Sequence, residues 1–273
     1  MPIIKQGFDV SIAPTIFRHC VEAIRDGELI RREGVADKEF HFQNWFKRQL
    51  EKVGLNFDAP GRNTYSDFRL VQAHEGYELK GLAYPGREAN YDCNSQVPSG
   101  EHNGRQVYYV FGRYPAKPDG NSYPVLDLVL CHGSLLNADN AYVHLNKSFR
   151  GFGSYGDILV RDRKMYVAPT PFALVQGTAH RRTLIVPADE DVGADFVQVG
   201  AFTRQEVDEV VVAYSFDLRT NTLETRKLPN PGAGTQHHFR AYRLSGDPEE
   251  QVTLRPADQI VADLVASAGN EDE

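Results

Sequence analysis

Apolar residues recur at helical spacing in the first part of the chain, up to about residue 54. In residues 13–31, Ile16, Phe17, Val21 and Ile24 fall on one face, and Pro14 suits the first turn of a helix. Residues 37–54 repeat the pattern more strongly, and Gly54 is a natural stop. The apolar face of this second segment consists of Phe42, Trp45, Phe46, Gln49, Leu50 and Val53. The pattern predicts two amphipathic helices.

After residue 54 the pattern changes to short runs rich in β-branched and aromatic residues, separated by turn residues. These runs predict strands at 66–72, 76–84, 105–114, 124–130, 156–167, 181–187, 209–218 and 239–244. The residues His74-Glu75-Gly76 join the first two runs closely enough for a hairpin. A final helix is expected at 256–269, where apolar residues follow Pro256 at helical spacing.

Helices, then many strands, then a last helix indicate an α+β protein. We expect a mixed central β-sheet flanked by helices, with an additional β-rich C-terminal part. The 273 residues are enough for one large domain, with a core at about 1–140, a β-rich part at about 141–255, and a helix and acidic tail at 256–273. Residues 84–105, rich in Gly, Pro, Asn and Ser, predict a long loop, and such loops in compact domains are more often functional than not.

Composition and charge narrow the class of protein only slightly. The chain is 41% hydrophobic and 25% charged, as globular proteins are, and no apolar run approaches the ~18 residues of a membrane helix. No secretion signal is visible, and the three cysteines lack zinc-site spacing, so we expect a cytoplasmic protein with reduced thiols. The net charge of −7 argues mildly against a protein that simply coats nucleic acid, but it is compatible with a nuclease that has a local basic patch.

Three charged residues interrupt the strand-like stretch 66–86, where charges are costly unless exposed or paired. Glu78 and Lys80 are two apart, so they point to the same side of a strand. Asp67 opens the preceding strand, and an antiparallel hairpin brings it towards the partner strand. Two carboxylates that meet repel each other unless a cation lies between them, and Mg²⁺ prefers such oxygen ligands. The alternative is an edge-strand salt bridge without chemistry.

The same residues fit the hydrolysis of a phosphodiester. A metal ion held by Asp67, Glu78 and the Leu79 carbonyl supplies a Lewis acid and lowers the pKa of a bound water. Lys80 is a compact charge with three donors, which suits it to orient that water against the phosphate.

Asp67 followed by Glu78-Leu79-Lys80 resembles the Asp…(Asp/Glu)-X-Lys signature of the PD-(D/E)XK nuclease superfamily. The stretches GYELKGLAYPG, NSQVPSG and GFGSYGDILVRDRKMYVAPTPF look like a type II restriction endonuclease. The signature covers about residues 38–115, and Ser66 stands where the motif has Pro. The resemblance implies a restriction-endonuclease-like core, with Asp67 and Glu78 as metal ligands and Lys80 as the water-positioning lysine.

Two other acidic positions are candidates for the site. Asp162-Arg163-Lys164 is a second triplet of the same form, but Asp157 precedes it by only five residues, which leaves little room for a separate strand. Glu39 extends the core-facing stripe of the second helix at its N-terminal end, and the superfamily often contributes a helix Glu to its metal site. The alternative for Glu39 is an acid that the helix dipole favours, and both interpretations stay open.

Candidate DNA contacts lie in the loop after Lys80 and in basic clusters of the C-terminal half, because Arg and Lys bind phosphates and Arg pairs with guanine. The loop candidates are Arg87, Asn90, Asp92, Asn94 and Gln96, with Asp92 also a possible metal ligand and turn chemistry as the alternative. The basic candidates are Arg161, Lys164, Arg181, Arg182, His238 and Arg240. A solvated strand face is the alternative for the last two.

The leading hypothesis is a Mg²⁺-dependent, sequence-specific endonuclease that cuts double-stranded DNA and leaves 5′-phosphate ends. We expect a homodimer, since two-fold symmetry suits a palindromic site, with catalysis in residues 1–140 and DNA reading in residues 141–255. The alternatives are a modification-dependent or repair nuclease that flips a base, a non-enzymatic β-rich binding module, and a two-carboxylate glycosidase in which Lys80 has no natural role.

Overall fold

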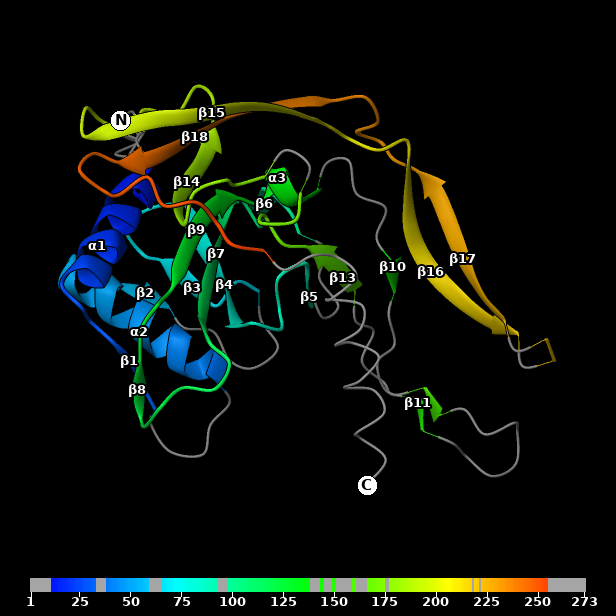
Figure 1. The fold of residues 1–273 in the computed structure, drawn as a ribbon. Coiled ribbons are helices and arrows are strands. Elements are labelled where there is room, and N and C mark those ends of the chain that lie inside the picture. Colours follow the sequence, from blue (N-terminus) through cyan, green and yellow to red (C-terminus); the bar gives the residue numbers. More distant parts are fainter. Residues whose placement is uncertain are drawn as a thin grey trace.

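The computed structural model has an α+β architecture around one mixed β-sheet (Figure 1). The residues that the structure describes are 11–32, 38–58, 65–92, 98–137, 143–144, 149–150, 159–160, 166–174, 177–217, 219–220 and 222–254. The expected α+β class with a mixed sheet is confirmed. The expected C-terminal helix and tail at 256–273 lie outside the described residues.

The helices of the described part are α1 Ala13–Arg25, α2 Lys38–Lys52 and the short α3 Ser134–Asn137. The first nine strands are β1 Ile30–Arg31, β2 Phe57–Asp58, β3 Phe68–Leu70, β4 Glu75–Tyr84, β5 Asn90–Asp92, β6 Glu101–His102, β7 Arg105–Pro115, β8 Ser122–Tyr123 and β9 Asp127–His132. They are followed by β10 Val143–His144, β11 Phe149–Arg150, β12 Leu159–Val160, β13 Tyr166–Pro169, β14 Arg182–Pro187, β15 Phe196–Gln205, β16 Glu209–Asp217, β17 Thr222–Pro229 and β18 Gln236–Leu244.

The central sheet, as far as the chain is described, has the strand order β15-β18-β14-β9-β7-β4-β3-β2, with β6 paired to β7. Strands β2, β3 and β4 form an antiparallel meander, and β7 then runs parallel to β4. β9 is antiparallel to β7, and β14 is parallel to β9. β3 pairs with the first part of β4 only, up to Tyr77, so β4 continues past the end of β3.

Helices α1 and α2 cover one face of this sheet (Figure 1). Phe17 and Val21 of α1 and Trp45 and Phe46 of α2 are fully buried there, as their helical spacing predicted. The facing strand residues include Tyr77, Leu79, Tyr108, Val110, Leu128 and Leu130. The two helices predicted before residue 55 are confirmed. The first ends earlier than predicted, because Gly27 takes a left-handed conformation (φ 75°) and Ile30–Arg31 form β1.

The opposite face of the sheet carries a second apolar cluster. Tyr109 and Phe111 of β7, Val129 and Cys131 of β9, and Phe172 belong to it. Side chains alternate along a strand, so Glu78 and Lys80 lie on this second face, while Tyr77 and Leu79 face the helices. The charged residues of interest are therefore on the side of the sheet away from α1 and α2.

Seven of the eight predicted strand runs overlap with observed strands, namely β3, β4, β7, β9, β14, β16 and β18. The run 156–167 contains β12 and the start of β13. The predicted hairpin joins β3 and β4, but its turn is at 71–74, because β4 already begins at Glu75. The long loop 84–105 contains the short strands β5 and β6.

A long two-stranded ribbon leaves the edge of the sheet. β15 and β18 pair in antiparallel register, and the chain continues beyond them as the hairpin β16–β17 (Figure 1). Of the four strands in this ribbon, β15 and β17 were not predicted. The ribbon belongs to the β-rich C-terminal part that the sequence predicted.

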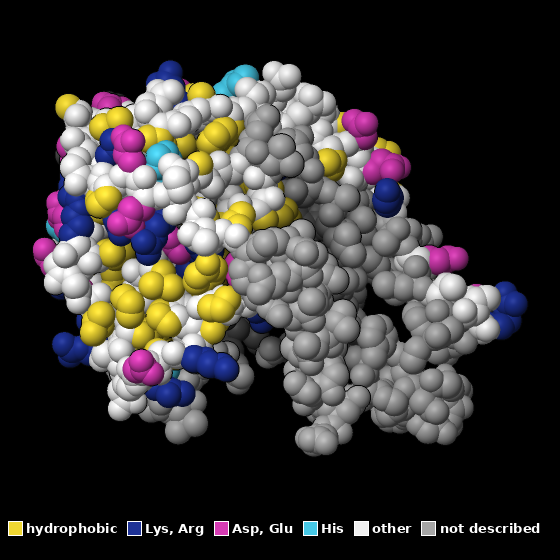
Figure 2. All heavy atoms as spheres, viewed as in Figure 1, with side chains coloured by type: hydrophobic (Ala, Val, Ile, Leu, Met, Phe, Trp, Pro, Cys, Tyr) yellow, Lys and Arg dark blue, Asp and Glu magenta, His cyan; other side chains and the backbone are white. Residues whose placement is uncertain are grey.

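Basic and acidic side chains are intermixed over the helical part of the face shown in Figure 2, with hydrophobic side chains beside them. No single sign of charge covers that face. Among the described residues, no helix is long and apolar enough to cross a membrane. Cys20 and Cys131 are buried free thiols, while Cys93 lies outside the described residues.

Candidate active site

Glu78 and Lys80 lie together on the face of the sheet away from the helices, and Asp67 contacts the same part of β4. Phe68 pairs with Tyr77 at the end of the β3–β4 ladder, so Asp67, one residue earlier, lies just beyond the paired segment. The Asp67 carboxylate is within hydrogen-bonding distance of the amide of Leu79, the residue between Glu78 and Lys80.

Lys80 and Glu78 form an ion pair that is largely shielded from water. Lys80 Nζ donates to Glu78 Oε1 over 2.8 Å, and the two side chains are 9% and 14% exposed. An exposed pair would contribute almost nothing to stability. Here, removing one partner leaves the other charge largely buried, so the two side chains hold each other in place.

The backbone of β4 fixes the position of Asp67. The Leu79 N–H donates to Asp67 Oδ2 over 2.7 Å, at the point where β3 no longer pairs with β4. In an antiparallel ladder, the N–H and C=O of one residue point towards the same neighbouring strand. The Leu79 carbonyl therefore points to the side on which Asp67 lies.

These groups form a set of oxygen donors that fits Mg²⁺. Two carboxylates from adjacent strands and one backbone carbonyl are hard ligands, and Mg²⁺ usually keeps several waters beside one or two carboxylates. No group of three or more His, Cys, Asp or Glu side chains that could hold a metal ion occurs within the described ranges. Glu39 lies in the first turn of α2, but its side chain is outside the described residues.

Two tyrosines that were not predicted border the site. The hydroxyls of Tyr65 and Tyr109 are 2.8 Å apart, and Tyr109 is level with Glu78 in the parallel pairing of β4 and β7. Burial raises the pKa of both phenols, and the negative charge of Glu78 acts in the same direction. Both phenols therefore stay protonated at neutral pH and serve as hydrogen-bond donors, not as bases. Tyr109 lies in the predicted strand 105–114, but only the pairing of β4 with β7 places it beside Glu78.

The loop after β4 only partly matches the expected DNA-facing loop. Arg87 and Asn90 are exposed beyond the C-terminal end of β4, and the backbone at Asn90 pairs with β13. Asp92 ends β5, but its side chain lies outside the described residues, as do Asn94 and Gln96. The structure thus places two of the five loop candidates at the surface.

Arg181 and Arg182 are engaged inside the protein. Arg181 bonds to Asp127 Oδ1 over 2.9 Å and to Glu250, and Arg182 Nε bonds to Asp247 Oδ2 over 2.7 Å. Asp127 and Asp247 are almost fully buried. These arginines neutralise buried carboxylates, so their first role is to stabilise the fold rather than to bind phosphates.

His238 and Arg240 are exposed on β18, on the helix-bearing side of the sheet. Arg240 pairs with Val186, whose side chain belongs to the core beneath the helices, whereas Phe239 and Ala241 belong to the opposite cluster. Both residues therefore lie across the sheet from Lys80. Tyr242 follows them on the same side of β18 and is buried against Phe196, so this strand face is solvated only in part. Arg161 and Lys164, with Asp162 of the second triplet, lie outside the described residues.

Comparison with models of known protein families, with curated proteins and with solved structures finds no match. The functional assignment therefore depends on the chemistry and geometry of this chain.

Proposed function

We propose that this protein is a Mg²⁺-dependent endonuclease of the PD-(D/E)XK superfamily that cuts double-stranded DNA at specific sites. One observation carries the proposal. Lys80 bonds to Glu78 on one face of β4, and the amide of Leu79, between them in the chain, holds the carboxylate of Asp67, which precedes β3. A Glu-X-Lys triplet that arose by chance has no reason to have a second acid anchored beside it.

Phosphodiester hydrolysis needs a nucleophilic water, neutralisation of charge on the phosphate and a stabilised leaving alkoxide. Mg²⁺ bound to the oxygen donors of this site would supply the Lewis acid. The chain supplies position and charge. Asp67 and Glu78 attract the cation, and the Lys80 ammonium presents donors that orient a water and stabilise the phosphate charge.

Tyr65 and Tyr109 offer the proposed site a further hydrogen-bond donor. Both phenols are protonated, and the charges of Glu78 and Lys80 act on Tyr65. Their hydroxyls form one hydrogen-bonded pair, so one hydroxyl hydrogen remains for a further acceptor. A phosphate oxygen or the water beside it is a suitable acceptor.

The proposal extends to a type II restriction enzyme that acts as a homodimer and leaves 5′-phosphate ends. Two copies related by a two-fold axis suit the cutting of both strands of a palindrome. The ribbon β16–β17 supports a DNA-reading role for the C-terminal part, since a two-stranded ribbon fits the major groove.

A non-enzymatic binding module is the rival that a specific observation favours. The Lys80–Glu78 bond of 2.8 Å satisfies both side chains without a substrate. This bond does not account for Asp67, which a structural ion pair would not need.

Cleavage of supercoiled plasmid in Mg²⁺ or in a chelator tests the proposal with wild type, Lys80→Ala and Asp67→Asn. Asn keeps an acceptor for the Leu79 amide but loses the charge. We expect each variant to lose about a hundredfold or more of the cleavage rate, the effect of removing one preorganised charge-stabilising group. Lys47→Ala is the matched control, because Lys47 is half-exposed on α2 across the sheet.

Circular dichroism and thermal unfolding establish that each variant folds. Cleavage that survives Lys80→Ala would contradict the proposed site. If the folded wild type cuts no DNA, methylated or unmethylated, in the presence of Mg²⁺, the binding module becomes the better interpretation.

A further inference from the structure

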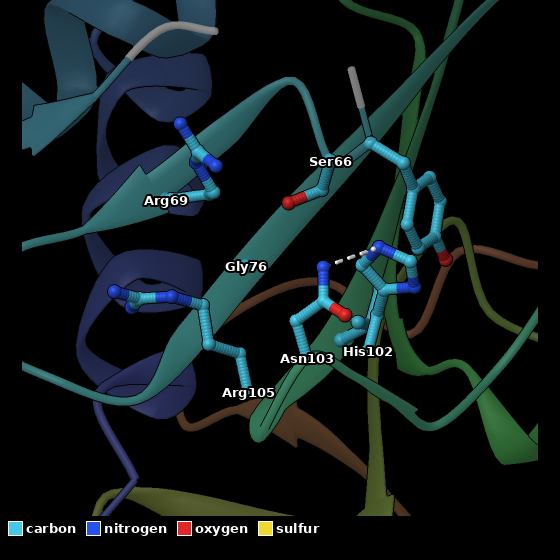
Figure 3. A pocket seen from close by; sticks show the side chains of 8 residues that line it. Ser66, Arg69, Gly76, His102, Asn103 and Arg105 are labelled. Atoms are coloured by element: carbon cyan, nitrogen blue, oxygen red, sulfur yellow. Dashed lines mark hydrogen bonds between the residues drawn. The ribbon is translucent and has the colours of Figure 1, made fainter.

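A small pocket lies next to the candidate active site, on the same face of the sheet (Figure 3). Arg69 of β3 and Arg105 at the start of β7 flank Gly76 of β4, while Ser66, His102 and Asn103 line the other side. Arg69 pairs with Gly76, and Gly76 is level with Val107 of β7. The pocket thus forms across three adjacent strands.

The missing side chain of Gly76 creates the pocket floor. A β-carbon at this position would come within 2.4 Å of Ser66 Oγ. The far rim is the tight turn between β6 and β7, in which Asn103 and Gly104 both have positive φ, as a type I′ turn requires. This turn brings His102 and Asn103 to the pocket, where Asn103 Nδ2 donates to His102 Nε2 over 3.0 Å.

Among the described residues that line the pocket, two are arginines and none is a carboxylate. Guanidinium groups remain charged at every pH of interest. Arg105 Nη1 donates to the carbonyl oxygens of Leu70 and Ala73, at 2.8 and 3.0 Å, which orient the side chain without neutralising it. Arg69 Nε is buried and has no acceptor in the described part of the chain.

Arg113 and Arg182, which are buried, each have a carboxylate partner. Arg113 bonds to Asp127 over 2.6 Å, and Arg182 bonds to Asp247 over 2.7 Å. Neither Arg69 nor Arg105 forms an ion pair with any residue that the structure describes. The exposed Asp58 is opposite Arg69 in the pairing of β2 and β3 but forms no ion pair with it. Two neighbouring positive charges repel each other, and a bound anion would reduce that cost.

The pocket lies next to the candidate active site of Asp67, Glu78 and Lys80. Gly76 and Glu78 point to the same face of β4 and are two residues apart, about 7 Å along the strand. Neighbouring phosphates of one nucleic-acid strand have a comparable spacing. Tyr65 joins the two places, because it lines the pocket, contacts His102 with ring centroids 4.9 Å apart, and bonds to Tyr109 beside Glu78.

We propose that this pocket, formed by Arg69, Arg105 and the His102–Asn103 turn over Gly76, binds the backbone phosphate next to the one that is cut. The inference rests on the proposed nuclease function and adds a positioning site to it. Arginine presents a planar fork of donors that matches phosphate oxygens, so the two guanidinium groups fix the strand while the chemistry takes place one phosphate away. Such contacts set register, not sequence preference.

Binding of a labelled duplex oligonucleotide in chelating buffer, measured over a series of salt concentrations, tests the pocket without any cleavage. We expect Arg69→Ala to weaken binding about tenfold or more, the value of one charge-assisted hydrogen bond, and to reduce the salt slope by about 0.9. Arg69→Lys keeps the charge, so the slope should be retained while the affinity falls. Gly76→Ala should weaken binding without any change of charge.

Arg31→Ala is the control, because Arg31 is exposed on β1, which packs against α2 on the other side of the sheet. Thermal unfolding of every variant excludes loss of the fold as the cause. An Arg69→Ala protein with wild-type affinity and slope would overturn the proposal. So would saturation of the pocket by millimolar inorganic phosphate that leaves duplex binding unchanged, since the site would then hold free phosphate.

The two proposals fail in different ways. If the wild type cuts DNA but Arg69→Ala binds and cuts normally, the pocket is wrong and the nuclease assignment stands. If the wild type never cuts DNA but its duplex binding depends on Arg69, the nuclease assignment is wrong and the phosphate site stands.

Discussion

The contribution of Glu190 to the free energy of unfolding should fall as the pH rises. The Tyr108 hydroxyl donates to Glu190 Oε2 over 2.9 Å near the buried Glu75. Burial, with a smaller contribution from the charge of Glu75, raises the pKa of Glu190 from its ordinary 4.5 to about 7. The perturbation that tests this is Glu190→Gln, which keeps the size of the side chain and removes its titration.

The sign and size of the effect follow from the two pKa values. The folded state holds the Glu190 proton more tightly than the unfolded chain, so this group contributes stability below pH 4.5 that is lost as pH rises to about 7. At about 1.4 kcal/mol per pKa unit, the loss is about 3 kcal/mol, and less where solvent reaches the half-buried carboxylate.

His132 opposes Glu190 over much of the same range. Burial is the main cause that lowers the pKa of His132 from 6.5 to about 4, so its contribution is present above pH 6.5 and is lost as pH falls to about 4. The two contributions oppose each other between pH 4.5 and 6.5. The stability of Glu190→Gln should therefore rise more steeply with pH than that of the wild type.

Urea unfolding at half-unit steps from pH 4.5 to 8 measures this difference. The free energy of unfolding of Glu190→Gln minus that of wild type should increase by about 3 kcal/mol across the range. Glu51→Gln, a change at an exposed carboxylate of α2, is the control and should show no comparable increase. A difference for Glu190→Gln that stays constant with pH would refute the reasoning.

Two further changes test the core of the sheet. Arg113→Leu should destabilise the protein by about 3 kcal/mol in urea unfolding at pH 7, because Asp127, nearly fully buried, would keep only its bond to the half-exposed Arg181. A cost below about 1 kcal/mol would show that Arg181 alone is sufficient. Gly112→Ala should cost about 1–3 kcal/mol, because the added β-carbon would come within 2.2 Å of the Phe42 ring. Phe42→Leu in the same protein should recover part of this loss in a double-mutant cycle, and simple additivity of the two costs would contradict the steric explanation.

Local spacing was enough to predict α1, α2 and most long strands. The stripe of Phe42, Trp45, Phe46 and Leu50 predicted α2, and all four side chains are fully buried in the fold. The alternation in 76–84 correctly predicted that Glu78 and Lys80 share a face, since an alternating strand allows no other arrangement. Gly27 ended α1 earlier than the apolar pattern suggested, because backbone conformation overrides periodicity at such a residue.

Pairing between distant segments was beyond the reach of these local patterns. Nothing in the residues of β7 specifies that it runs parallel to β4, and this pairing places Tyr109 beside Glu78. The same limit applies to Arg69 and Arg105, which are 36 positions apart in the chain and share one pocket only because β3, β4 and β7 are neighbours.

The basic residues also depend on contacts between distant segments. The sequence suggested Arg181 and Arg182 as phosphate-binding residues, whereas in the fold they bond to Asp127 and Asp247. The sequence by itself determined which residues alternate along the strands and that α1 and α2 form. The tertiary structure decided which charged side chains find ion-pair partners inside the protein, because that depends on contacts between residues far apart in the chain.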